Sequence, residues 1–314
     1  MAPVLKTTTD AESGKVLITW DEPSAVGTHG GYVKAADISY AITEGILSPF
    51  GEILTGDTLV KVKATTSATF NYNTDNGSQG MTYWVVLAKN AAGESGAVAY
   101  LMTGAPYSLP FEQTFADKKR NYFWIYGASK SKAISLDFAD DSYTNDGGTA
   151  ALTSSEADVA GYMTSGKIAL AGAVSPVLSF AHKEAQAGNT LSVSIVTPDG
   201  VEHSVADAAP SDTFAMKTID LKAFAGQRYV KVKFAVSYAE SGSCFIDDVR
   251  LTESGASGIE AIEGSSAGGL KAYTPDGVPV SLGNDGLRGL PKGLYIIRYK
   301  DAGGVQRAQK LVVR

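Results

Sequence analysis

The stretch Ser243-Cys-Phe-Ile-Asp-Asp-Val-Arg-Leu251 decides the fold of the middle of this chain. Apolar and polar residues alternate along it, and alternate side chains of an extended strand lie on the same face. The pattern therefore predicts a strand with Phe245, Asp247 and Val249 on one apolar face. A carboxylate there is costly unless a charge or a hydrogen-bond donor meets it. Asp247 is thus a candidate ligand of a bound cation; a backbone N–H, a lysine or exposure at the strand end are the alternatives.

Length and composition place this strand in a larger all-β protein. The chain has 314 residues and 34 glycines, and about 100 to 150 residues per domain gives two or three domains. Long runs with helical periodicity are almost absent, which predicts β-sandwich folds throughout. No apolar run approaches the roughly 18 residues of a membrane span. A net charge of -6 with scattered lysines argues against a nucleic-acid partner.

Cysteine and histidine usage excludes several chemistries. The single cysteine, Cys244, precludes an intrachain disulfide and is expected to be a buried, inert thiol. His29, His182 and His203 are far apart and lack zinc-ligand spacing. The start, Met1-Ala-Pro-Val-Leu5, has no basic segment followed by an apolar one. We expect either a cytosolic protein or, as the favoured interpretation, part of a longer exported precursor.

Residues 1–104 contain short β-rich runs at a spacing typical of a sandwich. These runs are 16–20, 36–42, 58–63, 67–72, 82–90 and 97–101. Trp20 lies in an early strand, Tyr40 in the next, and Tyr83 leads into a segment that ends in Ala88-Lys-Asn-Ala-Ala-Gly-Glu-Ser95. In this order the segment resembles a fibronectin type III domain. The resemblance implies a seven-stranded spacer or binding module without catalysis, with the aromatic residues in its core or on a sheet face.

Residues 105–254 carry enough strands for a jelly-roll sandwich. The clearest runs are 167–170, 177–180, 191–196 and 229–236. The last of them places Val230, Val232, Phe234 and Val236 inside, with Lys231 and Lys233 outside, which is typical of an antiparallel strand with one wet face. A polar, acidic loop is expected at 137–148.

This middle segment resembles the cleaved-adhesin and MAM-like jelly-roll modules of bacterial surface proteins. The matching features are Pro110-Phe-Glu-Gln-Thr-Phe115, Gly161-Tyr-Met-Thr-Ser-Gly-Lys-Ile-Ala-Leu170 with Pro176-Val-Leu-Ser-Phe180, and Phe245-Ile-Asp-Asp-Val-Arg-Leu251. The resemblance implies a structural Ca2+ near the first and last strands, held by Glu112 and Asp247.

Two further acidic residues and three aromatic residues complete the candidate sites. Asp140 and Asp141 lie in the acidic loop, whose oxygen-rich side chains suit a calcium shell, with a solvated turn as the equal alternative. Trp124, Tyr126 and Tyr143 are candidate ligand contacts, although core packing is the stronger expectation for the first two.

Residues 255–314 begin with a Gly/Ser-rich linker and end in a β-hairpin pattern. The stretches Leu290-Pro-Lys-Gly-Leu-Tyr-Ile-Ile-Arg-Tyr299 and Lys310-Leu-Val-Val-Arg314 resemble the C-terminal sorting domain of type IX secretion cargo. The Pro-Asn-Pro opening usual in that family is replaced by Gly258-Ile-Glu-Ala-Ile-Glu263. The resemblance implies export through secretion machinery to the bacterial surface or the medium.

Catalytic patterns are weak. Gly264-Ser-Ser-Ala-Gly268 matches a nucleophile elbow in letters, but its flanks are linker rather than strand and helix. Asp247 and Asp248 are adjacent on a strand, so they cannot form the carboxylate pair of a retaining glycosidase. Asp140 and Asp141 remain a weaker alternative for such a pair. We therefore expect no enzyme.

Together these patterns predict a non-catalytic, secreted or surface-exposed adhesin-like protein that binds a glycan or an extracellular host protein through its jelly roll. The alternative is an accessory carbohydrate-binding or spacer region of a larger secreted hydrolase. A third hypothesis is a stalk or matrix component without a soluble ligand.

Overall fold

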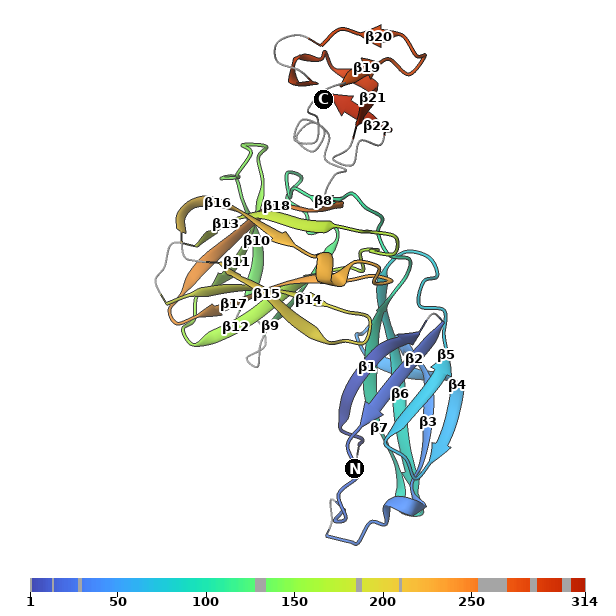
Figure 1. Ribbon diagram of the computed structural model, residues 1–314. Coiled ribbons are helices and arrows are strands. Elements are labelled where there is room, and N and C mark those ends of the chain that lie inside the picture. The colour runs from blue at the N-terminus through green and yellow to red at the C-terminus, as the bar shows by residue number, and fades with distance from the viewer. Residues whose placement is uncertain are drawn as a thin grey trace.

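The computed structural model describes residues 2–12, 14–27, 30–127, 134–184, 188–208, 211–253, 270–282, 287–300 and 306–313. Within these ranges the chain is built almost entirely of antiparallel strands, which confirms the all-β prediction (Figure 1). No helix in the described part is long and apolar enough to cross a membrane. His29, the linker that begins at 254 and the motif Gly264–Gly268 lie outside the described residues.

In its described residues the first sandwich has seven strands in two sheets. One sheet has the order β1-β2-β5 and the other β4-β3-β6-β7. The strands are β1 (Leu5–Glu12), β2 (Lys15–Trp20), β3 (Ser39–Leu47), β4 (Ile53–Lys63), β5 (Ser67–Asn71), β6 (Gly80–Asn90) and β7 (Gly93–Thr103). Six of these follow the predicted runs; β1 was not predicted because Leu5 is its only aliphatic residue larger than alanine.

Aromatic side chains fill the core of the first sandwich, because alternate residues of its strands face inward. Trp20, Tyr40 and Trp84 are buried in one cluster, as the sequence predicted for a core. The rings of Trp20 and Tyr40 lie 4.8 Å apart between centroids. Tyr83, the neighbour of Trp84, lies outside this cluster because it faces the other way.

The second sandwich is a jelly roll of two facing sheets. The larger sheet has the order β10-β11-β18-β13-β16, with β8 paired to β18, and the other has the order β15-β14-β17-β12-β9. Its strands are β8 (Phe111–Gln113), β9 (Phe123–Gly127), β10 (Ser135–Ala139), β11 (Thr149–Ser154), β12 (Val159–Ser165), β13 (Pro176–Glu184), β14 (Thr190–Val196), β15 (Glu202–Ala208), β16 (Ser211–Asp220), β17 (Lys231–Tyr238) and β18 (Gly242–Glu253).

Strand β17 follows its predicted alternation. Val232, Phe234 and Val236 are buried between the two sheets, and Lys231 and Lys233 lie on the opposite, outer face. Two other predictions for this region were wrong. Residues 167–170 form no strand, since Ile168 makes only isolated bridges, and the expected acidic loop begins later because Asp137 pairs with Ala151 within β10.

The prediction of a single apolar face along β18 was also wrong. The core contains Cys244 and Ile246 in the first half of the strand, but Val249 and Leu251 in the second half. The face changes because the pairing with β13 slips in register near Asp248, whose φ is +47°. Such a β-bulge inserts an extra residue and redirects the side chains that follow. Asp247 therefore points out of the core with Phe245, although it is fully buried beneath a loop.

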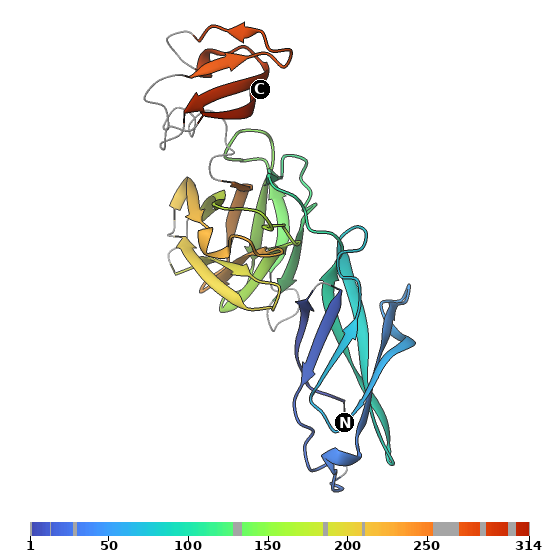
Figure 2. The same ribbon diagram turned by 45° about the vertical axis from the view of Figure 1, so that its right-hand side comes forward.

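The C-terminal sheet has the order β20-β19-β21-β22. Its strands are β19 (Lys271–Tyr273), β20 (Pro279–Val280), β21 (Gly293–Lys300) and β22 (Gln306–Val313). A separate small core forms around Leu287, Leu290 and Ile297. This sheet lies at the opposite end of the molecule from the first sandwich (Figures 1 and 2).

A buried ionic cluster joins the two sandwiches. The ammonium of Lys167 donates to Asp75 Oδ1 and to the carbonyl of Thr74, each at 2.8 Å. Arg228 forms an ion pair with the buried Asp10, which also accepts the hydroxyl of Tyr229 at 3.1 Å. Since each contact joins a residue of the first sandwich to one of the second, the cluster fixes their mutual orientation.

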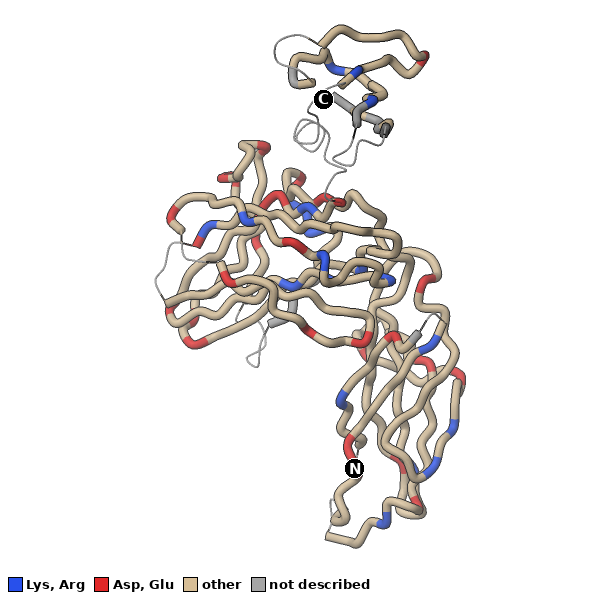
Figure 3. Tube along the Cα trace, viewed as in Figure 1, with Lys and Arg blue, Asp and Glu red and all other residues tan. Residues whose placement is uncertain are grey.

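A side-chain amide adds a second connection between the sandwiches. Gln79 accepts the backbone N–H of Lys167 at 2.7 Å and donates to its carbonyl at 2.8 Å. This two-point contact resembles the pairing of one strand residue with another. Elsewhere along both sandwiches, basic and acidic positions are interspersed (Figure 3).

Candidate ligand-binding groove

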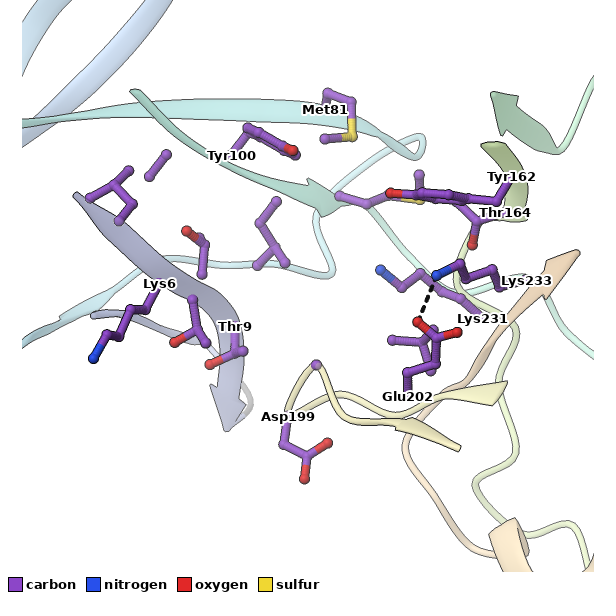
Figure 4. A pocket seen from close by; sticks show the side chains of 18 of the residues that line it. Lys6, Thr9, Met81, Tyr100, Tyr162, Thr164, Asp199, Glu202, Lys231 and Lys233 are labelled. Atoms are coloured by element: carbon purple, nitrogen blue, oxygen red, sulfur yellow. Dashed lines mark hydrogen bonds and ion pairs between the residues drawn. The ribbon is translucent and has the colours of Figure 1, made fainter. Parts of the chain in front are cut away.

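The junction of the sandwiches contains a groove of about 550 Å3 (Figure 4). One wall consists of β1 and β7 of the first sandwich. The other wall is the outer face of the sheet that contains β12, β14, β15 and β17. This volume lies within the usual range of small-molecule sites.

The first sandwich contributes an exposed aromatic residue. Along β7, Ala99 and Leu101 face the core, so Val98 and Tyr100 face outward. Tyr100 is 53% exposed and lies in the groove near Met81 (Figure 4). Its ring offers an apolar face with a hydrogen-bonding hydroxyl at the end.

The second sandwich contributes a tyrosine and an ion pair. Tyr162 and Thr164 alternate with the buried Met163 on β12, so both face the groove. The Lys233 ammonium lies 4.2 Å from the centroid of the Tyr162 ring and 2.6 Å from Glu202 Oε2. Burial by itself raises the pKa of Glu202, but hydrogen bonds from Lys233 and Ser194 outweigh it and lower the pKa. Glu202 therefore stays ionised at neutral pH.

The surroundings of Tyr162 in the groove raise its pKa. Burial raises the pKa of Tyr162, and the nearby Tyr100 and Glu202 raise it further. Tyr162 thus remains protonated at neutral pH, and its phenol can donate a hydrogen bond to a ligand.

The sequence-predicted aromatic contacts are divided between two places. In the backbone ladder Trp124 pairs with Thr164 and Tyr126 with Tyr162, next to the groove wall; their side chains lie outside the described residues. Tyr143 belongs to the loop after β10 and packs edge-to-face on Phe214 of β16, with centroids 6.3 Å apart. It therefore lies with the other sheet, away from β9.

The predicted metal ligands are also separated. Asp140 forms an ion pair with Lys118, and Asp141 forms one with Lys183. Glu112 is exposed and accepts Arg250 Nε at 2.8 Å. No group of three or more His, Cys, Asp or Glu side chains in the described part of the chain is arranged to hold a metal ion.

Asp247 and Asp248 nevertheless form an unusual buried acidic pair at the bulge of β18. Asp247 accepts the N–H groups of Tyr143 and Asp248, both at 2.8 Å. Burial raises the pKa of Asp247 to about 6 despite these hydrogen bonds, and Asp248 and Asp146 add to the rise. Burial also raises the pKa of Asp248, although Arg250 opposes the change.

Two buried side-chain oxygens of β18 and β8 lack a hydrogen-bond donor among the described residues. They are Asp248 Oδ2 and the amide oxygen of Gln113. Gln113 lies on β8 opposite Val249 and shares its core-facing side, whereas Asp248 meets Arg250, which pairs with Glu112 on the other side of the sheet. Buried oxygens are seldom left unpaired, and the carboxylate oxygens of Asp247 and Asp248 are of the kind that Ca2+ prefers.

Sequence reasoning missed the residues that line the groove. Lys231 and Lys233 were placed on the outer face of β17, and Tyr162 lies in a quoted motif, but nothing in the sequence indicated that the first sandwich covers this face. Tyr100 carried only the weak signal of an aromatic residue within the run 97–101.

No protein-family model matches the chain, and no curated protein sequence is similar to it. Comparison with solved structures finds carbohydrate-binding module CBM27-1 of Caldicellulosiruptor saccharolyticus in complex with mannohexaose, at 13% identity and a TM-score of 0.37, covering 46% of this chain and 97% of that one. A cleaved adhesin domain of Lys-gingipain from Porphyromonas gingivalis W83 has 14% identity and a TM-score of 0.36, covering 46% and 98%.

A third similar structure is tailspike protein 4 of bacteriophage CBA120, at 14% identity and a TM-score of 0.37. The match covers 44% of this chain but only 20% of the tailspike chain. These values are too low to assign a family or a ligand, so the groove itself carries the functional argument.

Proposed function

We propose that this protein is a non-catalytic binding protein that holds a glycan in the groove between its two sandwiches. The observation that carries the proposal is the pairing of two tyrosines, Tyr100 and Tyr162, with the charged pair Lys233 and Glu202 around one groove. Sugar rings present an apolar C–H face and a rim of hydroxyls. Aromatic rings pack against such a face, and charged side chains held in place form hydrogen bonds with the hydroxyls of the rim.

The rigid junction supports this function. Because the ionic cluster around Lys167 and Asp10 fixes the two walls, a ligand does not have to order them on binding. Preorganisation of this kind lowers the entropic cost of association. The groove is also open at its surface side, where Tyr100 is exposed, so a chain of sugar residues can enter without a lid opening.

The test is binding of the purified chain to a glycan array, followed by calorimetric titration with the best ligand. We expect Tyr162→Ala and Tyr100→Ala each to weaken binding by about tenfold or more, since loss of a buried aromatic contact has this typical size. Phe50→Ala is the matched control, because Phe50 is 92% exposed and lies in the β3–β4 turn outside the groove.

A different pattern of variant effects would place the ligand elsewhere on the second sandwich. If Tyr143→Ala abolishes binding and the groove variants do not, the ligand is held by the loop after β10 rather than by the groove. If Trp124→Ala or Tyr126→Ala weakens binding together with Tyr162→Ala, the site extends onto β9.

We also propose that Asp247 and Asp248 hold a structural Ca2+. The support is their burial together with Asp248 Oδ2, which lacks a hydrogen-bond donor among the described residues. A cation there would offset the cost of the buried carboxylates. Arg250 donates to Asp248 Oδ1 at 3.0 Å and leaves Oδ2 without a donor. Glu112 is a weaker candidate because it is exposed and bound by Arg250, and Asp140 and Asp141 already have lysine partners.

The biological role that we favour is an adhesin at the surface of a bacterium or outside it, with export assisted by the C-terminal sheet. An accessory region of a secreted hydrolase is the second candidate, and a stalk without a soluble ligand is the third. Fusion of residues 255–314 to a reporter in a bacterium with type IX secretion tests the export role: the reporter reaches the medium or surface only if that segment is a sorting signal.

A further inference from the structure

One lysine of the groove, Lys231, forms no ion pair with an acidic side chain in the described part of the protein. Lys231 and Lys233 both extend from β17 into the groove (Figure 4). Lys233 forms an ion pair with Glu202, and Lys6, on the other wall, forms one with Asp21 at 2.6 Å. Lys231 is half-buried, and its ammonium forms neither an ion pair nor a hydrogen bond with any described residue.

The surroundings of Lys231 make this arrangement costly for the free protein. Burial lowers the pKa of Lys231, and the positive charge of Lys167 lowers it further. The Lys167 ammonium has its own partners, the Asp75 carboxylate and the Thr74 carbonyl, and it offers Lys231 no negative charge. A half-buried cation without a counter-ion loses hydration that nothing in the described protein replaces.

The carboxylates that line the groove are already engaged. Glu202 is held by Lys233. Asp199 is exposed at the rim and accepts the hydroxyl of Thr197 at 2.6 Å, and its carboxylate is directed away from the lysines (Figure 4). An anion brought by a ligand is therefore the natural partner of Lys231.

We propose that the groove selects anionic glycans, with the Lys231 ammonium bound to a carboxylate or sulfate group of the sugar chain. This inference rests on the proposed glycan function and specifies the class of sugar. Tyr100 and Tyr162 contact the ring faces, and Lys231 adds a charged subsite at the β17 wall. A uronic acid residue and a sulfated sugar residue share the required chemistry.

The selection follows from a difference between two bound states. A neutral sugar leaves the ammonium half-buried and unpaired, so the unfavourable desolvation persists in the complex. An acidic sugar removes it and gains a charge-assisted hydrogen bond. Lysine is a compact point charge that imposes no planar, bidentate geometry, so carboxylate and sulfate are both accepted.

The test uses matched pairs of oligosaccharides that differ only in charge. Oligogalacturonates are compared with their methyl esters, and sulfated galactan oligosaccharides with their desulfated forms, by calorimetric titration at two salt concentrations. We expect the acidic member of at least one pair to bind about tenfold or more tightly than its neutral partner, the typical effect of a hydrogen bond to a charged group. The advantage should shrink at the higher salt concentration.

Variants assign the effect to Lys231. Lys231→Met should remove the preference for the acidic member and leave binding of the neutral member unchanged, while Lys231→Arg should retain the preference. Lys61→Met is the control, because Lys61 is an exposed lysine on β4 that does not line the groove. An unchanged thermal midpoint of each variant verifies that it is folded.

The outcomes separate the two proposals. Equal binding of acidic and neutral members, or a preference that survives in Lys231→Met, overturns the anionic selectivity and leaves glycan binding intact. Absence of binding to any glycan, on the array and in titration, overturns both. A preference confined to the carboxylate pair or to the sulfate pair supports the inference and identifies the source of the anion.

Discussion

Removing either partner of the ion pair between Lys167 and Asp75 should lower stability, but by different amounts. The Lys167 side chain is 1% exposed, whereas that of Asp75 is 31% exposed. In Asp75→Ala the buried ammonium keeps the Thr74 carbonyl and the Tyr229 ring, whose centroid is 5.0 Å away, but loses its ion-pair partner. In Lys167→Met the carboxylate retains Arg228 Nη1 at 3.4 Å and contact with water.

The expected magnitudes follow from these exposures. Removing one partner of a buried pair typically costs about 3 to 5 kcal/mol, because it leaves a buried charge unpaired. We expect Asp75→Ala to cost about 3 kcal/mol and Lys167→Met about 1 kcal/mol or less, since an apolar side chain of similar length fills the same space. The cost of Asp75→Ala cannot exceed the free energy that docks the two sandwiches, because undocking would hydrate Lys167 again.

Scanning calorimetry at pH 7 measures both effects. We expect Asp75→Ala to lower the unfolding temperature of the sandwiches and to separate their transitions, and Lys167→Met to leave the profile close to wild type. Asp21→Ala is the matched control, since the pair of Asp21 with Lys6 is exposed, at 47% and 58%, and is expected to contribute less than about 1 kcal/mol. If Lys167→Met is as damaging as Asp75→Ala, the pair contributes attraction rather than merely offsetting burial, and the reasoning fails.

Three further predictions concern the second sandwich. Ca2+ should raise the thermal midpoint of the wild type and not that of Asp247→Asn; equal shifts in both would contradict a cation at this site. Burial, and secondarily Lys217, lowers the pKa of His182, so below about pH 6.5 the unfolded chain binds more protons at this residue than the folded chain does. The stability of the wild type relative to His182→Phe should therefore fall as the pH falls through that region. Urea titrations between pH 5 and 7 that show the same stability difference between the two proteins at every pH would exclude the effect. Tyr238→Phe should cost about 2 kcal/mol in urea unfolding, because the phenol donates to the Leu152 carbonyl and accepts the Cys244 N–H, both buried; a loss within error would mean that the freed groups find other partners.

The sequence predicted those parts of the fold that depend on local alternation. Strand β17 has Val232, Phe234 and Val236 inside, as its pattern indicated, and Trp20 and Trp84 lie in the core of the first sandwich. These predictions hold because each strand buries one face against a sheet of its own domain. Alternation carries that information directly.

The bulge in β18 shows where alternation stops being sufficient. The residues Phe245, Asp247 and Val249 read as one face, but the positive φ at Asp248 shifts Val249 to the face of Ile246. Aspartate tolerates the left-handed region better than most residues, so the sequence allowed a bulge here without requiring one. Its effect was to place two carboxylates in one buried site rather than on opposite faces of a regular strand.

The groove depends on contacts that no local pattern encodes. Lys231 and Lys233 belong to a face that would be wet in an isolated jelly roll, and it becomes half-buried only because β1 and β7 of the first sandwich lie over it. That position depends on Asp10, Asp75 and Lys167, which are separated by as many as 157 positions in the sequence. The same packing that gives Tyr100 and Tyr162 a common groove also strips water from Lys231. Affinity for a sugar ring and preference for an anion therefore have one structural origin, the docking of the two sandwiches, and a variant that undocks them should lose both together.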